Sequence, residues 1–497
     1  MNDARRVTLY LTGHVPTPSP PRAHSDVSSV TAGSPLTIAS VLAVQAFDRS
    51  SPDIYIDVDT EVGVDRGVFQ MKTRVLRWGA WTNMRSRATR LFLAVTTVLA
   101  TGGTVVLASG GTASAASSPI TIAFVCSCSG AAGPEYQGAV GALTARIDVA
   151  NAAGGVNGRK IKTIVLDDQT NPTADATAVQ EAVSKGVTGI VAVSAVFFEG
   201  AKYANQAGIP VTGASSDGPE WGTQPYTNMF ASDTGSVDPK YPVSTLIGKF
   251  LVSRGGNVVG SYGYGISPSS TRSAIGTVQS VEHAGGKEGV LDSSVAFGSV
   301  DFTSAALTAK SKNVNGIYGA MDDNSNFALA TAMKQAGVKL KAVIFPTGYE
   351  PAVITSPAWK DLQGDYFGSD YRPFQAPNAA TAQMQAALIK YDHFSKSEFP
   401  AFVQYESWAG ADLMISGLQK AGKNPTPSSV VKALRGIKAY TAGGLLPVPI
   451  NYSTIFGHDL SPACTWILQA KTKGFVVAGS KPACGTDIPG TSTASAS

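Results

Sequence analysis

The residue types that most often carry out catalysis are thinly spread along this chain. Its histidines lie far apart in the sequence, at His14, His24, His283, His393 and His458. Neither a G-x-S-x-G nor an H-E-x-x-H motif is present, and the Gly286-Lys287 pair is followed by Glu288 instead of the Ser or Thr of a phosphate-binding loop. We therefore expect a protein that is not an enzyme and that binds no metal and no cofactor.

Four cysteines are the remaining candidates for covalent chemistry. Cys464 and Cys484 flank a strand-like stretch at 465–477, and we expect a disulfide between them that closes the C-terminal segment. Cys126 and Cys128 are separated by one residue, so their side chains point to one face of a strand and a small disulfide is one interpretation. A metal site is the alternative, and the lack of a histidine or a second cysteine pair nearby in the sequence speaks against it.

Length and composition indicate an ordered protein with more than one domain. The chain has 497 residues, of which 43% are hydrophobic and 15% charged, so it can bury a sizeable core. The net charge of +4 is a mild imbalance. Because no basic stretch is interleaved with aromatic residues, nucleic acid is not an expected partner.

Residues 84–115 have the order of a secretory signal peptide. A basic run at 84–90 is followed by an apolar stretch at 91–108 and by an A-x-A cleavage pattern at 113–115. An uncleaved membrane anchor is the alternative, although the apolar stretch is barely long enough to span a bilayer. No cysteine follows the cleavage pattern, so we expect an exported, extracytoplasmic protein without a lipid anchor that begins near Ala116.

The two ends of the chain do not fit this scheme of an exported folded protein. Residues 1–83 contain a Pro-rich stretch at 15–22 and show no sustained helical or strand period. We interpret Met84 as the true start and residues 1–83 as an over-extended reading frame, or as a poorly ordered extension if they are made. Residues 485–497 form a tail of mostly small residues, which we expect to be disordered.

Strands and helices are expected to alternate from residue 119 onward. Apolar strands are expected at 120–125, 161–166, 189–193 and 210–212, with helices at 136–151, 174–185 and 200–207. The pattern then restarts, with strands at 257–261, 289–294, 316–319 and 340–345 and helices at 243–253, 272–284, 301–312, 326–335, 379–396, 405–421 and 428–435. Such alternation predicts two α/β lobes with parallel sheets. Ligands of such sheets bind beyond the carboxyl ends of the strands, which here would face a cleft between the lobes.

One stretch identifies a family. The run ARIDVANAAGGVNGRKI at 145–161, followed by a strand and by the acidic pair at 167–168, resembles the branched-chain amino-acid-binding family of type I periplasmic binding proteins. The second half adds DFT at 301–303, which opens a helix, and KQAG at 334–337, which closes one. The resemblance extends over nearly all of residues 119–484.

The resemblance implies two Rossmann-like lobes joined by three crossover hinge strands. We expect lobe 1 to comprise 116–232 and 373–447, lobe 2 to comprise 233–372 and 448–484, and the crossovers to lie near 230–233, 369–372 and 447–450. In this family a ligand closes the hinge, and the permease and ATPase subunits of an ABC importer read the closed form.

The resemblance also implies where a ligand would bind. Its carboxylate is expected on the first lobe, against backbone N–H groups and small hydroxyl residues. The matching positions are Ser194, Ala195 and Val196 after the third strand and Ala214, Ser215 and Ser216 after the fourth. The alternative for the last two serines is that they only cap a turn.

Two further positions are expected at the cleft. Ser129 follows the first strand, where a small residue permits close approach of a ligand at the cleft mouth. Tyr264 matches a position at which an aromatic residue covers the ligand, and an ordinary exposed turn tyrosine is the alternative.

The chain departs from the family at the ligand's ammonium group. Amino-acid-binding members hold it with an acidic residue in the loop after the strand at 342–345, where this chain has Thr347, with Glu350 displaced. Asp322 or Asp323 takes this role in our interpretation, because a buried ammonium without a carboxylate is strongly unfavourable. The alternatives are that both aspartates cap the following helix, or that the ligand is not an α-amino acid.

We therefore expect an exported, monomeric solute-binding protein that carries a small carboxylate-bearing, amino-acid-like solute to an ABC importer. One alternative is a ligand-sensing clamp of the same fold that acts with a signalling partner, although no kinase or transmembrane module follows residue 484. The other is an exported enzyme on the same scaffold, because fold alone does not exclude it.

Overall fold

The computed structural model describes most of the chain beyond residue 117 and three strands before it. Residues 118–493 are described except for 216, 222, 235–240 and 455–462. The chain divides into two compact units, Met1–Gly110 and Gly111–Ser497. The expected signal peptide at 84–115 and expected site residue Ser216 lie outside the described residues.

The first unit contains a three-stranded antiparallel sheet in the order β1-β2-β3. Its strands are β1 (Leu11–Thr12), β2 (Tyr55–Asp65) and β3 (Val68–Trp78). This regular structure differs from the expectation for residues 1–83. The sequence of β2, YIDVDTEVGVD, alternates apolar and polar residues, and this period of two is the signal that could have found the strand.

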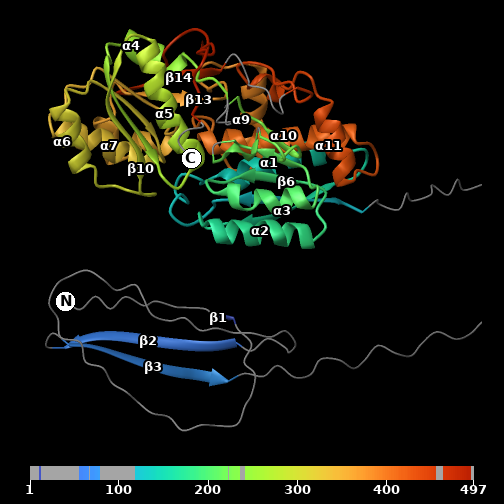
Figure 1. Ribbon diagram of the computed structural model, residues 1–497. Coiled ribbons are helices and arrows are strands. Elements are labelled where there is room, and N and C mark those ends of the chain that lie inside the picture. Colours follow the sequence, from blue (N-terminus) through green and yellow to red (C-terminus); the bar gives the residue numbers. More distant parts are fainter. Residues whose placement is uncertain are drawn as a thin grey trace, which may run out of the picture. The chain divides into compact units, whose positions relative to one another are not determined.

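The first lobe of the second unit is built on a five-stranded parallel sheet in the order β5-β4-β6-β7-β8 (Figure 1). Its strands are β4 (Ile120–Cys126), β5 (Ile161–Asp167), β6 (Ile190–Val193), β7 (Val211–Gly213) and β8 (Met229–Ala231). Its helices are α1 (Ala139–Ala152), α2 (Pro172–Ser184), α3 (Ala201–Gln206), α9 (Ala379–Tyr391), α10 (Phe402–Lys420) and α11 (Pro427–Arg435).

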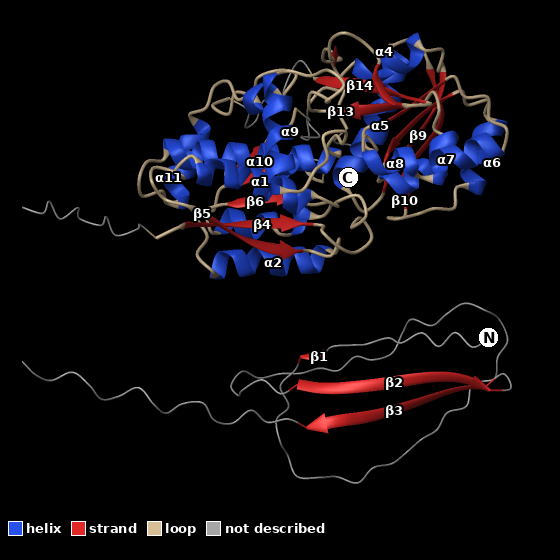
Figure 2. Ribbon diagram, turned by 180° about the vertical axis from the view of Figure 1, so that it is seen from behind, coloured by secondary structure: helices blue, strands red, loops and turns tan. Residues whose placement is uncertain are grey.

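Alternation along the strands divides the core of this lobe into two layers. In β4, Ile122 and Phe124 belong to the core shared with α1 and α10, whereas Ala123 and Val125 belong to the core shared with α2 and α3. Figure 2 shows α1 and α10 on one side of the strands and α2 on the other. Helix α10 is buried along most of its length, so a charged residue in it has to be accommodated inside the protein.

The second lobe has a mixed sheet in the order β10-β9-β11-β12-β13-β14-β15, and β16 pairs with β14. The strands are β9 (Val258–Tyr264), β10 (Lys287–Val295), β11 (Gly316–Ala320), β12 (Ala342–Phe345), β13 (Tyr366–Ser369), β14 (Cys464–Lys471), β15 (Gly474–Val477) and β16 (Ala483–Cys484). The pairs formed among strands β9 to β13 are parallel. Strand β14 pairs antiparallel with β13, β15 and β16. The expected fold class of two α/β lobes with parallel sheets is confirmed.

Helices cover both faces of this second sheet (Figure 1). They are α4 (Leu246–Ser253), α5 (Pro268–His283), α6 (Thr303–Ser311), α7 (Asp323–Gln335) and α8 (Pro351–Thr355). Tyr318 and Ile344 belong to the core shared with α4 and α5, and Ile317 and Phe345 to the core shared with α7. None of the helices in the described part of the chain has the length and apolar character needed to cross a membrane.

The chain passes between the lobes three times, and the third passage differs from the expected position at 447–450. Ile450 pairs with Tyr440 just after α11, and the Tyr452 hydroxyl donates to the carbonyl of Ala231 at the end of β8. The chain is therefore still on the first lobe at Tyr452. The strand pairing of Ile450 keeps it there, which the Pro-rich sequence around it did not suggest.

Residues 485–493, where a disordered tail was expected, pack along the start of α4. The Thr245 N–H donates to the Thr486 carbonyl (2.9 Å), and the Ile488 N–H donates to the Val243 carbonyl (2.9 Å). Ile488 is buried. Backbone pairing thus orders a segment whose small side chains suggested disorder.

Both expected disulfides are present. Cys464–Cys484 joins β14 to β16, and Cys126–Cys128 lies at the carboxyl end of β4. The disulfide interpretation of the Cys-x-Cys pair is thereby confirmed over the metal site.

Replacing Cys464 and Cys484 by serine should lower the free energy of unfolding by about 3 kcal/mol, because the bridge joins residues 20 apart and so removes entropy from the unfolded chain. Calorimetric melting of the oxidised proteins measures the effect. The matched control is the double serine variant of Cys126 and Cys128, whose bridge closes a far shorter loop. An equal loss in the control would contradict the prediction.

Candidate ligand-binding site

A cavity of about 430 Å³ lies where the two lobes face each other. In the first lobe its wall includes Glu135 after β4, Ala195 after β6 and Ser215 after β7. In the second lobe it includes Tyr264 at the end of β9 and Asp322 after β11. These are the carboxyl ends of parallel strands, which is where ligands bind in open α/β sheets.

The cavity continues from the cleft into the second lobe. There its wall is formed by the start of α4 and by the sheet, with Val243, Leu246, Ile247, Tyr318 and Ile344. The cavity therefore joins a polar region between the lobes to an apolar region beneath α4.

The structure brings some of the expected site residues together and leaves others behind the wall. Ala195, Ser215, Tyr264, Asp322 and Thr347 line the cavity. Ser194, Val196, Ala214 and Asp323 are buried and do not form its lining, and Ser129 is exposed at the surface. Ser129 instead donates from its backbone N–H to Asp167 (3.1 Å).

The backbone donors expected to hold a carboxylate are used within the first lobe. The Ala195 N–H donates to the hydroxyl of Ser127 (3.0 Å), and the Val196 N–H donates to the hydroxyl of Ser194 (3.0 Å). The Ser127 hydroxyl in turn donates to Asp168 (2.8 Å). The sequence pointed to the loop at 127–136 but to Ser129 within it, whereas the residue that holds the Ala195 N–H is Ser127, between the two cysteines.

Ser215 holds a carboxylate that belongs to the protein. Its backbone N–H donates to Oδ2 of Asp233 (2.7 Å), and its hydroxyl donates to Oδ1 of the same residue (2.5 Å). Asp233 follows β8, where the chain leaves the first lobe, and it also lines the cavity. The donor pair assigned to a ligand is therefore satisfied by an internal anion.

Asp322 caps α7 and also faces the cavity. It accepts a hydrogen bond from the Ser325 N–H (2.9 Å), as the capping interpretation expects. The Tyr264 hydroxyl bonds both to Asp322 and to the Ser325 hydroxyl. Burial, followed by the charge of Asp322, raises the pKa of Tyr264. Tyr264 is buried and packs on Phe297, so it is not an exposed turn residue.

Four carboxyl groups meet beside α7, and we call Glu135, Asp322, Asp323 and Glu350 the α7-side group. Burial, followed by Asp323 and Asp322, raises the pKa of Glu135 well above its ordinary value. Burial, followed by Glu350, does the same to Asp323, and burial raises the pKa of Glu350 to about 7. Glu135 comes from the first lobe and the other three from the second, so this group spans the cleft.

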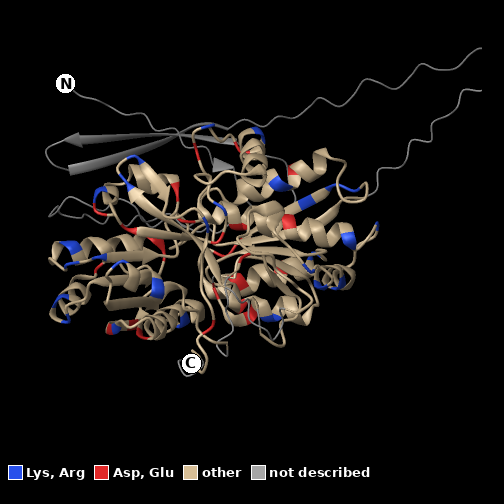
Figure 3. Ribbon diagram, turned by 90° about the horizontal axis from the view of Figure 1, so that it is seen from above, with Lys and Arg blue, Asp and Glu red and all other residues tan. Residues whose placement is uncertain are grey.

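Three more carboxyl groups meet where the chain crosses between the lobes, and we call Asp233, Asp370 and Glu406 the hinge-side group. Glu406 lies in α10 and is 7% exposed. Burial, followed by Asp233, Asp370 and Asp217, raises its pKa well above the ordinary value. A lone charged residue in the apolar start of α10 is the sequence signal that could have found it. Figure 3 shows acidic residues gathered where the two lobes meet.

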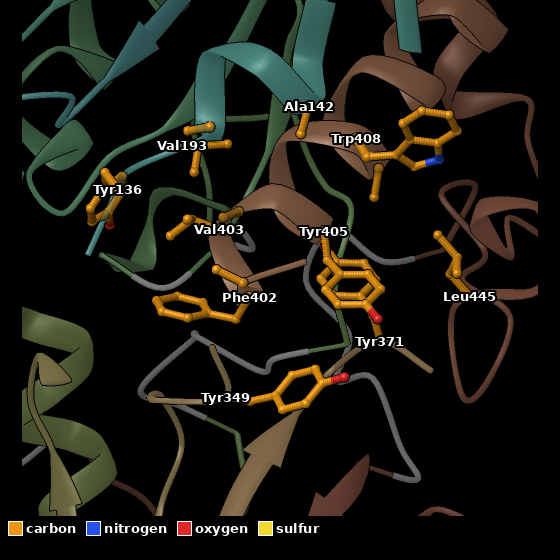
Figure 4. Packing of buried hydrophobic residues seen from close by; sticks show 14 of the residues in the cluster. Tyr136, Ala142, Val193, Tyr349, Tyr371, Phe402, Val403, Tyr405, Trp408 and Leu445 are labelled. Carbon is orange, nitrogen blue, oxygen red and sulfur yellow. The ribbon is translucent and has the colours of Figure 1, made fainter. Parts of the chain in front are cut away.

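An aromatic stack supports this end of the cavity. The rings of Tyr371 and Tyr405 are parallel, with centroids 5.7 Å apart, and Tyr349 stacks on Tyr405 at 6.3 Å (Figure 4). Tyr371 follows β13, Tyr405 lies in α10 of the first lobe and Tyr349 follows β12 of the second. The stack therefore links both lobes to a crossing segment.

No described group of histidine, cysteine and acidic residues has the geometry of a metal site. The carboxyl groups that line the cavity are suited instead to hydrogen-bond donors or cationic groups of an organic molecule.

Comparisons with known proteins agree with this architecture. The model of the family described as periplasmic binding protein matches residues 119–475. No curated protein sequence matches the chain. The resemblance expected from the sequence is confirmed.

The match between this chain and several solved structures of the same fold extends over nearly the whole length of those structures. A fatty acid ABC transporter substrate-binding protein from Thermomonospora curvata is 16% identical with a TM-score of 0.61, covering 75% of this chain and 93% of that one. A branched-chain amino acid ABC transporter protein from Thermus thermophilus with bound valine is 17% identical with a TM-score of 0.60, covering 73% and 96%. A solute-binding protein from R. palustris in complex with benzoate is 17% identical with a TM-score of 0.59, covering 75% and 98%.

Replacing Tyr264 by phenylalanine should lower the free energy of unfolding by about 2 kcal/mol, because Asp322 and Ser325 lose a buried partner. Denaturant titration measures the change. Tyr262→Phe in the same strand is the matched control, because its buried hydroxyl has no partner among the described residues and its removal should cost nothing. Equal losses in the two variants would contradict this role for the Tyr264 hydroxyl.

Proposed function

Because the chain belongs to the periplasmic binding protein family, we propose that it is a non-catalytic solute-binding protein that delivers a small solute to an ABC importer. The observation that carries this proposal is the cavity between the lobes, whose wall combines residues of both with the segments that cross between them. A solute held by both walls stabilises the closed arrangement, and the importer recognises that arrangement.

The proposed solute is small and amino-acid-like and carries a carboxylate. Valine and benzoate, the compounds bound in two of the similar structures, both have this group. In this chain the carboxylate would approach the edge formed by Ala195 and Ser215, and it would take the place of Asp233 on the Ser215 donors.

Among the expected site residues, we propose two roles. Those that line the cavity contact the solute directly: Ala195, Ser215, Tyr264, Asp322 and Thr347. Those that do not form the lining act by positioning the first set: Ser129, Ser194, Val196, Ala214 and Asp323. For Ser216, which lies outside the described residues, we propose the same role from its place in the sequence after Ser215.

The proposed setting is the extracytoplasmic space. The signal-peptide pattern at 84–115 supports export, and the absence of a cysteine after it supports a protein without a lipid anchor. The proposed partners are the permease and ATPase subunits of the importer. We propose that the protein is a monomer when it meets them.

The test is native mass spectrometry of the gently purified full chain, followed by thermal melting with amino acids, amines and small carboxylates. A bound solute at 100 times its Kd should stabilise the protein by about 2.7 kcal/mol and raise Tm in a dose-dependent way. The solute should be recovered chemically unchanged, which distinguishes a carrier from an enzyme. A protein with no co-purifying mass and no response across the panel would contradict the proposal.

A further inference from the structure

The described lining of the cavity is one-sided in charge. Its only basic side chain is Arg272. Burial, followed by Asp217, raises the pKa of Glu220 in the first lobe, and the charge of Arg272 opposes this rise, so Arg272 and Glu220 lie within electrostatic reach of each other. Its acidic side chains are Glu135, Asp233, Asp322, Asp370, Glu406 and Asp487. A solute that enters the cavity therefore meets an excess of carboxyl groups.

Two of these carboxyls are buried and lack hydrogen bonds from the described residues. Glu406 is 7% exposed, and its Oε2 atom has no partner there. Glu135 is 8% exposed and receives no hydrogen bond from any described residue. Buried polar groups without partners are rare in folded proteins, and each calls for a ligand or another explanation. Both of these face the cavity.

The two glutamates belong to different carboxyl groups. Glu406 lies in the hinge-side group with Asp233 and Asp370, and Glu135 lies in the α7-side group. Three carboxyls of the second lobe, Asp323, Asp322 and Glu350, act on Glu135 more strongly than Glu406 does. The cavity thus offers two separate places for positive charge.

We propose that the solute carries two cationic nitrogens, one held by Glu406 with Asp233 and Asp370, the other held by Glu135 with Asp322. The cavity then selects organic cations of net positive charge, such as diamines or basic amino acids. This inference rests on the proposed function, because it takes the cavity to be the solute site.

Hydrogen-bonding capacity supports the same chemistry. An ammonium group presents three donors and a guanidinium five, and carboxyl oxygens are acceptors for both. A carboxylate on the solute has to displace Asp233 from the Ser215 donors, because these donors and the Ala195 N–H are already used within the protein. Charge-assisted bonds of this kind are about twice as strong as neutral ones.

Binding of such a cation should release protons. In the empty cavity burial and the neighbouring carboxyls favour the protonated forms: Asp233, Asp370 and Asp217 around Glu406, and Asp323, Asp322 and Glu350 around Glu135. The raised pKa values mean that these glutamates lose a proton when a cation arrives. Affinity should therefore fall as the pH is lowered, because the protonated form competes with the cation.

The experiment is isothermal titration of the full chain with lysine and four compounds that each lack one or more of its charged groups. Lysine has two ammonium groups and a carboxylate, cadaverine has only the two ammonium groups, norleucine and 6-aminohexanoate each lack one nitrogen of lysine, and hexanoate lacks both. Lysine or cadaverine should bind most tightly, each missing nitrogen should weaken binding at least 10-fold, and hexanoate should not bind. Titrations in buffers of different ionisation enthalpy should show proton release.

Two isosteric variants identify the groups responsible. Glu406→Gln and Glu135→Gln should each weaken cadaverine at least 10-fold and reduce the number of protons released. Glu220→Gln is the control, because this glutamate is also buried but does not line the cavity, and it should leave the affinity unchanged. Circular dichroism of each variant establishes that it is folded.

The outcomes separate this inference from the function on which it rests. Binding of hexanoate or norleucine as tightly as lysine and cadaverine, with no effect of Glu406→Gln, would overturn the inference and leave the solute-binding function intact. A chain that binds none of the five compounds overturns the inference as well, and the function then falls only if the wider panel and native mass spectrometry also find no solute.

Discussion

The two lobes meet around carboxyl groups that are largely shielded from water, and this constraint governs the rest of the cavity. Glu135, Asp323 and Glu406 are buried, and the described lining of the cavity holds six acidic side chains against the single arginine Arg272. An unpaired carboxylate costs several kcal/mol to bury, so such a group stays protonated or takes a cation from outside. The charge state of the cavity is therefore not fixed by the fold. It depends on pH and on what the cavity contains.

This dependence is coupled to the relative position of the lobes. Glu135 belongs to the first lobe, whereas the carboxyls that raise its pKa most, Asp323 and Asp322, belong to the second. Closing the cleft brings these groups together, and separating the lobes moves them apart. A neutralising proton or cation thus favours the closed arrangement, while ionisation of the empty cavity opposes it. Occupancy and hinge position are linked through electrostatic repulsion as well as through direct contacts.

The hydrogen-bond partners of a carboxyl and its place at the cavity together indicate whether it builds the fold or is open to a ligand. Asp322 caps α7 and bonds to Tyr264, and Asp175 accepts the Gly200 N–H (2.6 Å) inside the first lobe. Asp322 is thus satisfied without a solute, whereas Asp175 keeps its Oδ1 atom without a partner among the described residues. Glu406 keeps an oxygen unpartnered in the described structure, although it lies in a helix that is otherwise well packed. Burial and an unpartnered oxygen do not by themselves mark a ligand site: Glu406 also lines the cavity, whereas Asp175 does not.

The sequence predicted the elements well because they depend on local periodicity, and it predicted the site only in part because the site depends on contacts between distant residues. The alternation of strands and helices located the strand ends that carry Ala195, Ser215, Tyr264 and Asp322. It did not reveal that Asp233 occupies the Ser215 donors, because 18 residues and a strand separate the two. A backbone N–H donates one good hydrogen bond, so a ligand's carboxylate can use the Ser215 N–H only after it displaces Asp233. The position of a binding residue can be inferred from a related sequence. Whether its hydrogen-bond donor is available depends on contacts that only the folded chain shows.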